Sequence, residues 1–456
     1  MKTIELRATS RRLQRLPRRF GPCFGRIEAQ EHSLGYLRGL LLAEGRKSVE
    51  PMALVFGGPS PRRPSIDQNV VLAWQRFLTV SPWEANAVQR EIQAVFVEEF
   101  VPSASEWAIG TVGVIDGSGF VKRGSHSVGV ARQWCGRLGK VENCQVGVFV
   151  LGVTPAGTTL LEHQLYLPQE WTEDEKRRQK TRVPEEITFQ TKPQIAAALL
   201  QRNTVRFDWV IADEEFGRDG DLLDALELAA QRYLMEVPCD TTVWTDRPMR
   251  TTPDAYVWQV RLLVDTLPEK AWQTIQLREG AKGPLVFQFA RLRIWSVRHR
   301  HGGPPLWLLI RRSLEAEPEV KYYLSNAAAD TPLETMALVS GSRGRVEEFF
   351  EDAKGQLGMS QYEARSWTSW HHHMSLVALA HLFVTQTRRD LKRDVPELTL
   401  DMAMRLVRSA LTRPRLSSDD AMELTEYYLG RNRQARASHR KSWLAKHKNV
   451  IPKTLL

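Results

Sequence analysis

The chain has 456 residues, 42% hydrophobic and 25% charged, which is typical of soluble globular proteins and long enough for more than one domain. Its 63 lysines and arginines against 53 acidic residues give a net charge of +10, which favours a polyanionic partner, although a merely basic enzyme has the same charge. Without a CxxC pair, an apolar signal core or an apolar run of about 18 residues, the sequence predicts a reduced cytoplasmic protein with no structural zinc and no membrane contact.

The first 105 residues are predicted to be helical. Apolar residues recur every three or four positions in 34–45 and 86–101, and a Pro/Gly/Ser-rich loop at 57–65 lies between these segments. From residue 106 to 243 the chain reads as α/β. The predicted strands there are 111–116, 126–134, 143–153, 158–167, 207–213 and 233–238, and the predicted helices are 192–203 and 221–232. This order predicts a mixed sheet.

Residues 244–330 are predicted to be mostly β, with strands at 255–264, 285–299, 306–313 and 320–326. A second helical part follows over 331–390. The region 391–456 is also predicted to be helical, and it ends in a basic run, Arg431 to Lys448, that contains no acidic residue. Five regions are therefore expected, and they have the bounds 1–105, 106–243, 244–330, 331–390 and 391–456.

Two aspartates follow apolar strands in the same way. In GVID and WVIAD the predicted strand ends on Asp116 or Asp213, and a glycine comes within a few residues. A buried carboxylate is costly unless it is hydrogen-bonded or binds metal, so two of them in one sheet would suit Mg²⁺. For either aspartate alone, capping of a turn or of the next helix is the simpler interpretation.

A third carboxylate lies in SRGRVEEFFEDAKGQLG. If this segment is helical, Val346, Phe349, Phe350, Ala353 and Leu357 form an apolar stripe. Beside it runs a polar stripe, which comprises Arg343, Glu347, Glu351 and Lys354. A helix docked by the apolar stripe could aim Glu347 at the aspartates, with Arg343 and Lys354 placed to hold phosphates. The alternative is a solvent-facing row of ion pairs.

Other motifs are uninformative or absent. Histidines 371–373 are consecutive, so a helix would point their side chains in different directions. Packing is their expected role, and the alternative for one of them is a contact with DNA. No GxxxxGK[ST], HExxH or GxSxG motif is present, which excludes P-loop, zincin and α/β-hydrolase chemistry of those types.

The sequence resembles bacterial insertion-sequence transposases of the DDE superfamily, most closely insertion-sequence family 701. The resemblance covers roughly residues 20 to 390 and depends on long segments of the sequence. These segments are GYLRGLL, IDGSGFVKRGSHSVGVARQWCG, LGKVENCQV, LYLPQEWT, FQTKP, VIADEEFG and RGRVEEFFEDAKGQLGMSQYEARSWTSWHHH. Four positions depart from the family pattern: Gly117, Ser118, Ser340 and Gly344.

The resemblance implies an RNase H-like mixed α/β core interrupted by the β-rich insertion. It also implies a catalytic and metal-binding triad of Asp116, Asp213 and Glu347, with Glu348 and Glu351 as alternatives to the third member. Two Mg²⁺ ions, or Mn²⁺ as a substitute, would support DNA cleavage and strand transfer. Lys122, Arg123, Arg343 and Lys354 would contact phosphates, and His126 would position the strand or stabilise the hairpin.

The implied partners are double-stranded DNA, as terminal inverted repeats and target, and a second copy of the chain, in the cytoplasm and nucleoid of a bacterium. The helical N-terminal region would bind the inverted repeats, with Arg11 and Arg12 in contact with DNA, unless they belong to a solvated arm. Arg431 and Arg433 would contact DNA or lie in a flexible tail. Two alternative functions remain: a domesticated DNA-binding protein that no longer transposes, and an RNase H-like nuclease that cuts without joining.

Overall fold

The computed structural model describes residues 3–58, 67–247, 257–280, 283–299, 301–392, 398–411 and 417–446. Three predicted segments lie partly outside these ranges. They are most of the loop at 57–65, the start of the strand at 255–264 and the last residues of the basic run. No helix within them is long and apolar enough to cross a membrane.

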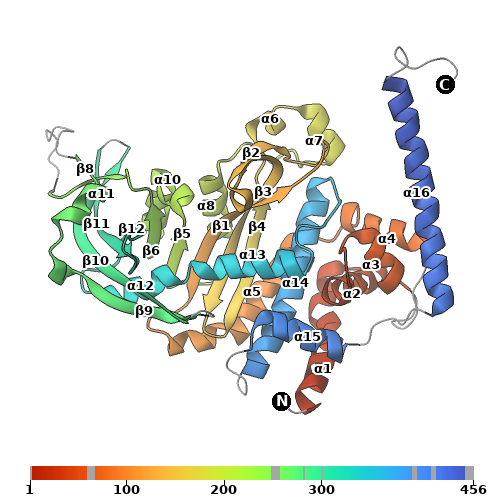
Figure 1. The fold of residues 1–456 in the computed structure, drawn as a ribbon, viewed down its shortest axis with the longest axis horizontal. Coiled ribbons are helices and arrows are strands. Elements are labelled where there is room, and N and C mark those ends of the chain that lie inside the picture. The colour runs from red at the N-terminus through yellow and green to blue at the C-terminus, as the bar shows by residue number, and fades with distance from the viewer. Residues whose placement is uncertain are drawn as a thin grey trace.

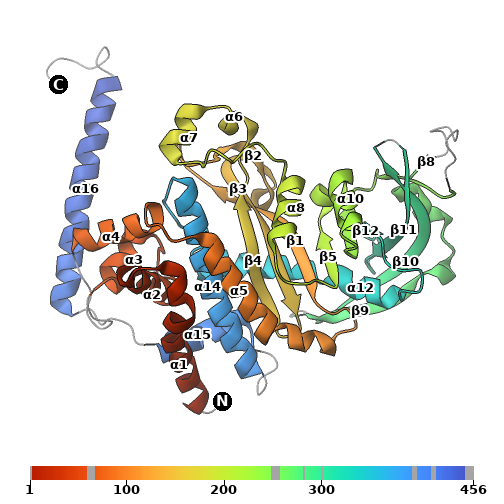
Figure 2. The ribbon, with the colours of Figure 1, turned by 180° about the vertical axis from the view of Figure 1, so that it is seen from behind.

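The N-terminal region is helical, as predicted, and its helices share one core with the rest of the protein. Its elements are α1 (Thr3–Phe20), η1 (Gly21–Phe24), α2 (Ile27–Leu42), α3 (Val49–Phe56), α4 (Gln68–Thr79), α5 (Ala85–Glu99) and η2 (Val101–Glu106). Helices α2, α4 and α5 pack against α14 (Trp367–Lys392), and α5 also packs against β4 (Gly157–Leu165). Figure 2 shows α5 and α14 lying alongside this strand.

Twelve strands of the described chain form one sheet. The first six are β1 (Val112–Val121), β2 (Ala131–Cys135), β3 (Lys140–Thr154), β4, β5 (Trp209–Ala212) and β6 (Tyr233–Val237). Among them the order β4-β3-β1-β5-β6 has antiparallel neighbours on one side of β1 and parallel neighbours, β5 and β6, on the other. This is the mixed sheet of an RNase H-like core, as the sequence predicted.

The β-rich segment extends this same sheet. It contains β7 (Thr242–Trp244), β8 (Val257–Gln259), β9 (Gln273–Gly280), β10 (Gly283–Arg298), β11 (His301–Arg312) and β12 (Val320–Ser325), with short helical turns α11 (Val260–Leu263), η5 (Val264–Thr266) and η6 (Glu269–Ala271). Strand β12 pairs with β6, so the extension joins the core directly. The prediction of a strand over 255–264 was wrong in its second half, because residues 260–263 form the short helix α11.

Helices cover both faces of the sheet (Figure 1). On one face lie α12 (Leu333–Gly341), α13 (Gly344–Gln356) and α14, and α13 contacts both β1 and β4. The opposite face is covered by α8 (Lys192–Arg202), α9 (Glu214–Gly217) and α10 (Gly220–Leu228), whose apolar residues form a second core cluster with it. Two short helices, α6 (Gln169–Thr172) and α7 (Glu175–Thr181), and the turn η3 (Gly136–Leu138) complete the core.

The C-terminal region has two helices, α15 (Leu400–Ala410) and α16 (Ser418–Lys446). Helix α15 packs on α13, α14 and α1. Helix α16 touches the N-terminal helices near Tyr427, whose hydroxyl donates to Glu50 at 2.8 Å. Its second half extends away from the body of the protein (Figure 1). Residues 431–443 are exposed on every face of the helix.

Candidate active site

Three carboxylates form a row across neighbouring parallel strands. Ile115 of β1 is in register with Ala212 of β5, and Ala212 with Met235 of β6. The next residue along the chain is acidic in each case, which gives the carboxylate row of Asp116 in β1, Asp213 just after β5 and Glu236 in β6. Adjacent strands are about 4.8 Å apart, so neighbours in this row share a site.

The sequence predicted that Asp116 ends its strand, and this was wrong. Strand β1 continues to Val121, so Asp116 lies inside it and pairs with Phe149 of β3. Glycines at 117 and 119 do not break the strand because extended backbone is open to glycine as to any residue. The continuous strand holds Asp116 on a fixed backbone, buried under α13.

Asp213 both caps a helix and faces the site. Its Oδ1 accepts a hydrogen bond from the Glu215 amide at 3.0 Å, which starts α9, and its Oδ2 faces Arg343. The capping role expected for a lone aspartate is therefore present together with the site-facing one. The segment DEEFG, residues 213–217, ends on a glycine because a Cβ on Gly217 would lie 2.0 Å from the Glu236 carbonyl oxygen. Only glycine lets α9 pack this closely on β6.

The guanidinium of Arg343 lies among the acidic residues. Its Nη2 is 3.5 Å from Asp213 Oδ2 and 3.9 Å from Asp116 Oδ2, and its Nε is 3.8 Å from Glu236 Oε2. Its Nη1 is 3.2 Å from Glu347 Oε1. Arg343 precedes α13 as its N-cap residue, and its side chain is 18% exposed. The sequence predicted a phosphate-facing residue here, whereas this arginine points inward.

Glu347 reaches the same guanidinium from α13, while the neighbouring Glu348 points elsewhere. Arg278 of β9 and Arg345 bind the Glu348 carboxylate at 2.5 and 3.0 Å. The apolar stripe predicted for this helix is present, with Val346, Phe349, Ala353 and Leu357 buried. The docking inferred from the stripe therefore favours Glu347 over Glu348, and the side chain of Glu347 remains 69% exposed.

Burial and neighbouring negative charge disfavour the ionised form of both aspartates. Burial raises the pKa of Asp116, the neighbouring Asp213 carboxylate raises it further, and Arg343 opposes both. Burial likewise raises the pKa of Asp213, and Arg343 lowers it. Burial alone would lower the pKa of Arg343, but Asp116, Asp213 and Glu236 outweigh it and the net shift is upward. A site with more negative than positive charge attracts further cations.

The donor set suits a divalent metal. Carboxylate oxygens are the ligands that Mg²⁺ and Mn²⁺ take from proteins, and the row already converges on one cationic group. Asp116 and Asp213 are the adjacent pair, and Glu347 approaches from the opposing helix. Within the described ranges no three His, Cys, Asp or Glu side chains come close enough to one point to hold an ion. Glu347 would have to turn inward to complete the triad.

Two predicted phosphate-binding lysines have partners inside the protein. Lys354 Nζ donates to Ser118 Oγ at 2.7 Å and to the Gly119 carbonyl at 3.1 Å, which ties α13 to β1 beyond Asp116. Lys122 Nζ donates to the Tyr362 carbonyl at 2.9 Å and lies 3.2 Å from the centre of the Tyr362 ring. Burial lowers the pKa of Lys122 to about 7.

The remaining predicted DNA contacts lie on the surface. Arg123 and His126 are exposed in the loop between β1 and β2, and Arg11 is exposed on α1. Arg12 instead forms an ion pair with Asp390 of α14. Helix α1 is not a solvated arm, because Leu13, Leu16 and Phe20 bury one of its faces.

On α16, Arg433 is exposed, whereas Arg431 is 3.3 Å from Glu50. The three consecutive histidines pack inside the protein, as expected. The Leu165 amide is 3.4 Å from His371 Nε2, His372 stacks on Trp83, and Tyr36 is 2.8 Å from His373 Nδ1.

Two departures from the family pattern can be judged at the site. Ser118 accepts the hydrogen bond from Lys354, so it takes part in holding β1. A Cβ on Gly117 would lie 3.8 Å from Glu215 Oε2, so a side chain would fit there. Sequence reasoning missed Glu236 altogether. The signal in the sequence was an acidic residue inside the apolar run YLMEV. Strand pairing aligns Met235 with Ala212, so Glu236 follows Met235 in the same way as Asp213 follows Ala212.

Comparisons with known proteins identify the family. A family described as "DDE superfamily endonuclease" matches residues 19–284, and a family described as "Transposase DDE domain" matches residues 189–383. A curated relative from Microchaete diplosiphon, "Probable transposase for insertion sequence element IS701", is 32% identical over 159 residues, which cover 33% of this chain and 37% of that protein. The first family match covers more than half of the 456 residues. We conclude that this chain belongs to the DDE superfamily of endonucleases.

Proposed function

We propose that the protein is a transposase that cuts and joins DNA at the terminal inverted repeats of an insertion sequence, in a cut-and-paste reaction. The main support is the placement of Asp116 and Asp213 side by side on an RNase H-like sheet, beneath the helix that carries Glu347. The similarity to a probable transposase of IS701 points in the same direction.

In this proposal Asp116, Asp213 and Glu347 hold two Mg²⁺ ions, for which Mn²⁺ can substitute. Metal held by these residues would supply the charge that activates water or a DNA 3′-hydroxyl and that stabilises the leaving oxygen of an in-line displacement. The protein supplies position: β1 fixes Asp116, and α9 orients Asp213 through the Glu215 amide. Lys354 of α13 donates to Ser118 and Gly119, which follow Asp116 in β1. These contacts keep α13, and with it Glu347, over the sheet.

Double-stranded DNA is the proposed substrate, held by two copies of the protein. Arg123 and His126 lie exposed on the loop that follows β1, so they would contact the strand near the scissile phosphate. Lys122 has protein partners in this arrangement and would contribute less charge. Arg11 on α1 and Arg433 on α16 would contact flanking duplex through its phosphates.

Cleavage and joining of labelled DNA that carries the gene's own flanking ends would test this proposal. With Mg²⁺ or Mn²⁺, the wild type should cut and transfer strands, and Asp116→Ala should do neither. End binding without cutting by the wild type would instead favour a domesticated DNA-binding protein, and cutting without joining would favour a nuclease. Cutting that survives Asp116→Ala would mean that the active site lies elsewhere.

A further inference from the structure

Glu236 and Arg343 make a contact that the proposed chemistry does not use. Glu236 Oε2 and Arg343 Nε are both buried and face each other at 3.8 Å, and neither has a hydrogen-bond partner in the part of the chain that the structure describes. The other oxygen of Glu236 accepts a hydrogen bond from Lys321 of β12 at 2.9 Å. Buried polar atoms without partners are uncommon, so this pair of atoms indicates an arrangement that can change.

The position of Glu236 separates it from the metal-binding pair. It lies on β6, two strands away from Asp116 on β1, which places the two backbones about 10 Å apart at the usual strand spacing. Lys321 also neutralises its carboxylate from the side of β12. Glu236 is thus placed to hold Arg343 and not to share an ion with Asp116.

We infer that Glu236 is a positioning residue that holds Arg343 over Asp116 and Asp213, so that the guanidinium and divalent metal compete for these two carboxylates. This inference rests on the proposed function. Without metal, Arg343 offsets the repulsion between the aspartates. A metal ion bound by the two aspartates would repel the positively charged guanidinium and displace it from the carboxylate row. The displaced guanidinium could then bind a DNA phosphate at the edge of the site.

The place of Arg343 in the chain permits this movement. It lies between α12 and α13 as the N-cap of α13, and its immediate neighbour Gly344 carries no side chain to restrict it. Its distances of 3.5 to 3.9 Å from the row are longer than those of close ion pairs. Nη2 donates one long hydrogen bond to Asp213 Oδ2 at 3.5 Å, whereas the contacts with Asp116 and Glu236 are interactions of charge alone.

Manganese binding to the full-length protein without DNA, measured from the electron paramagnetic resonance signal of free Mn²⁺ at constant ionic strength, tests the inference. Arg343→Gln should bind Mn²⁺ roughly tenfold more tightly than the wild type, a typical coupling between two competing sites. Its melting temperature should fall in EDTA and recover with Mn²⁺. Arg343→Lys keeps the charge and should bind Mn²⁺ like the wild type. The matched control Arg345→Gln, which changes an arginine paired with Glu348, should leave the affinity unchanged.

Glu236→Gln separates a positioning role from metal ligation. If Glu236 holds Arg343, this variant should bind Mn²⁺ more tightly than the wild type, and an equal or weaker affinity would overturn the inference. Unchanged affinity in Arg343→Gln, or equal gains in Arg343→Lys and Arg343→Gln, would overturn it as well. Asp116→Asn should lose Mn²⁺ binding, and wild-type affinity in that variant would reject the proposed site itself.

Discussion

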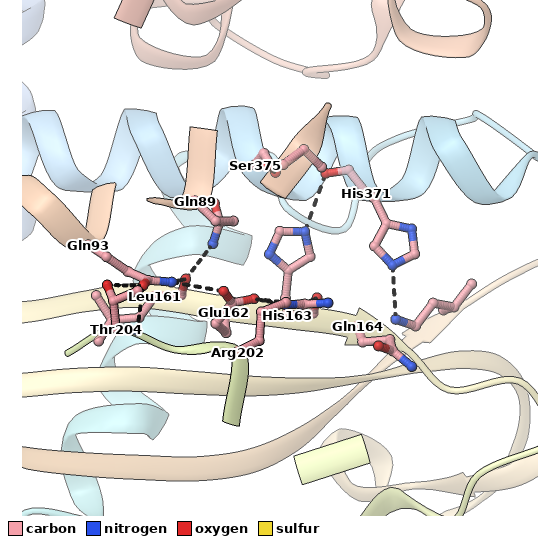
Figure 3. Close-up of polar contacts among 12 residues, drawn as sticks. Gln89, Gln93, Leu161, Glu162, His163, Gln164, Arg202, Thr204, His371 and Ser375 are labelled. Carbon is pink, nitrogen blue, oxygen red and sulfur yellow. Dashed lines mark hydrogen bonds and ion pairs between the residues drawn. The ribbon is translucent and has the colours of Figure 1, made fainter. Parts of the chain in front are cut away.

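Two buried carboxylates in this sheet have opposite surroundings. Glu162 on β4 is almost fully enclosed, and both of its oxygens are bound: Arg202 donates at 2.5 and 2.9 Å and Gln93 at 2.8 Å (Figure 3). Asp116 on β1 is buried nearly as deeply, yet its cationic neighbour is 3.9 Å away and another carboxylate lies beside it. A carboxylate that serves the fold has its partners within the chain, whereas one that serves chemistry keeps binding capacity for a partner outside it.

The largest effect should come from the helix that faces Asp116. Glu347→Gln removes a carboxylate charge from the proposed metal site while it keeps the shape of the side chain. We expect the rate of metal-dependent DNA cleavage to fall on the order of 10³-fold, measured in single-turnover assays. Glu348→Gln is the matched control, because Arg278 and Arg345 hold that residue in a structural role. Normal cleavage by Glu347→Gln with loss in Glu348→Gln would move the third carboxylate to Glu348.

The next effect concerns the enclosed carboxylate. Glu162→Gln leaves Arg202 without its anion in a network that also holds Gln93, and Thr204 in turn binds Gln93 at 2.7 and 2.9 Å (Figure 3). Since Arg202 is 37% exposed, water compensates part of the loss, and we expect the free energy of unfolding to fall by about 2 kcal/mol. Urea denaturation measures it. Glu363→Gln, in an exposed pair with Arg46, should change little. Equal effects in both variants would remove the distinction between the two kinds of carboxylate.

How far the sequence predicted this contrast depends on which interactions are local. The apolar stripe around Phe349 and the capping position of Asp213 follow from spacing along the chain, and both are present. Strand register is not local, so the sequence could not place Glu236 beside Asp213. The direction of the Arg343 side chain depends on the sum of several charges from separate strands, whereas spacing alone predicted a phosphate contact beside Glu347.

The end of β1 was misjudged for a related reason. Asp116 and two glycines look like a turn, but ten residues of β3 pair with β1 and keep the strand extended. Tertiary pairing here outweighs local preference. The predicted Lys122 contact with DNA illustrates the same limit, since its partner Tyr362 is 240 residues away in sequence.

A smaller effect of the opposite sign is expected for Asp116 itself. Its pKa is raised in the folded protein, so folding takes up a proton at intermediate pH and the wild type loses stability as the pH rises toward that pKa. Asp116→Asn removes this cost. In EDTA at pH 8 we expect the variant to be about 1 kcal/mol more stable than the wild type, with the difference shrinking toward pH 5. Thermal melts across this range measure it.

The exposed Asp240→Asn variant serves as the control for this series and should show no such trend. A less stable Asp116→Asn at pH 8 would mean that the contact with Arg343 outweighs burial and repulsion. Asp116 would then resemble Glu162 more closely than the geometry indicates.

The smallest effect extends the contrast between paired and unpaired charges to α16. Arg431 lies 3.3 Å from Glu50, whereas Arg433 forms no ion pair with the part of the chain that the structure describes. A phosphate contact from Arg433 would release one counterion, so Arg433→Gln should lower the slope of log affinity against log salt by about 0.9. Fluorescence anisotropy with a duplex of unrelated sequence measures this slope. Arg431→Gln should change it less, because Glu50 already neutralises that charge. If both variants shift the slope equally, the ion pair with Glu50 opens on DNA, and if neither does, α16 does not contact the phosphates.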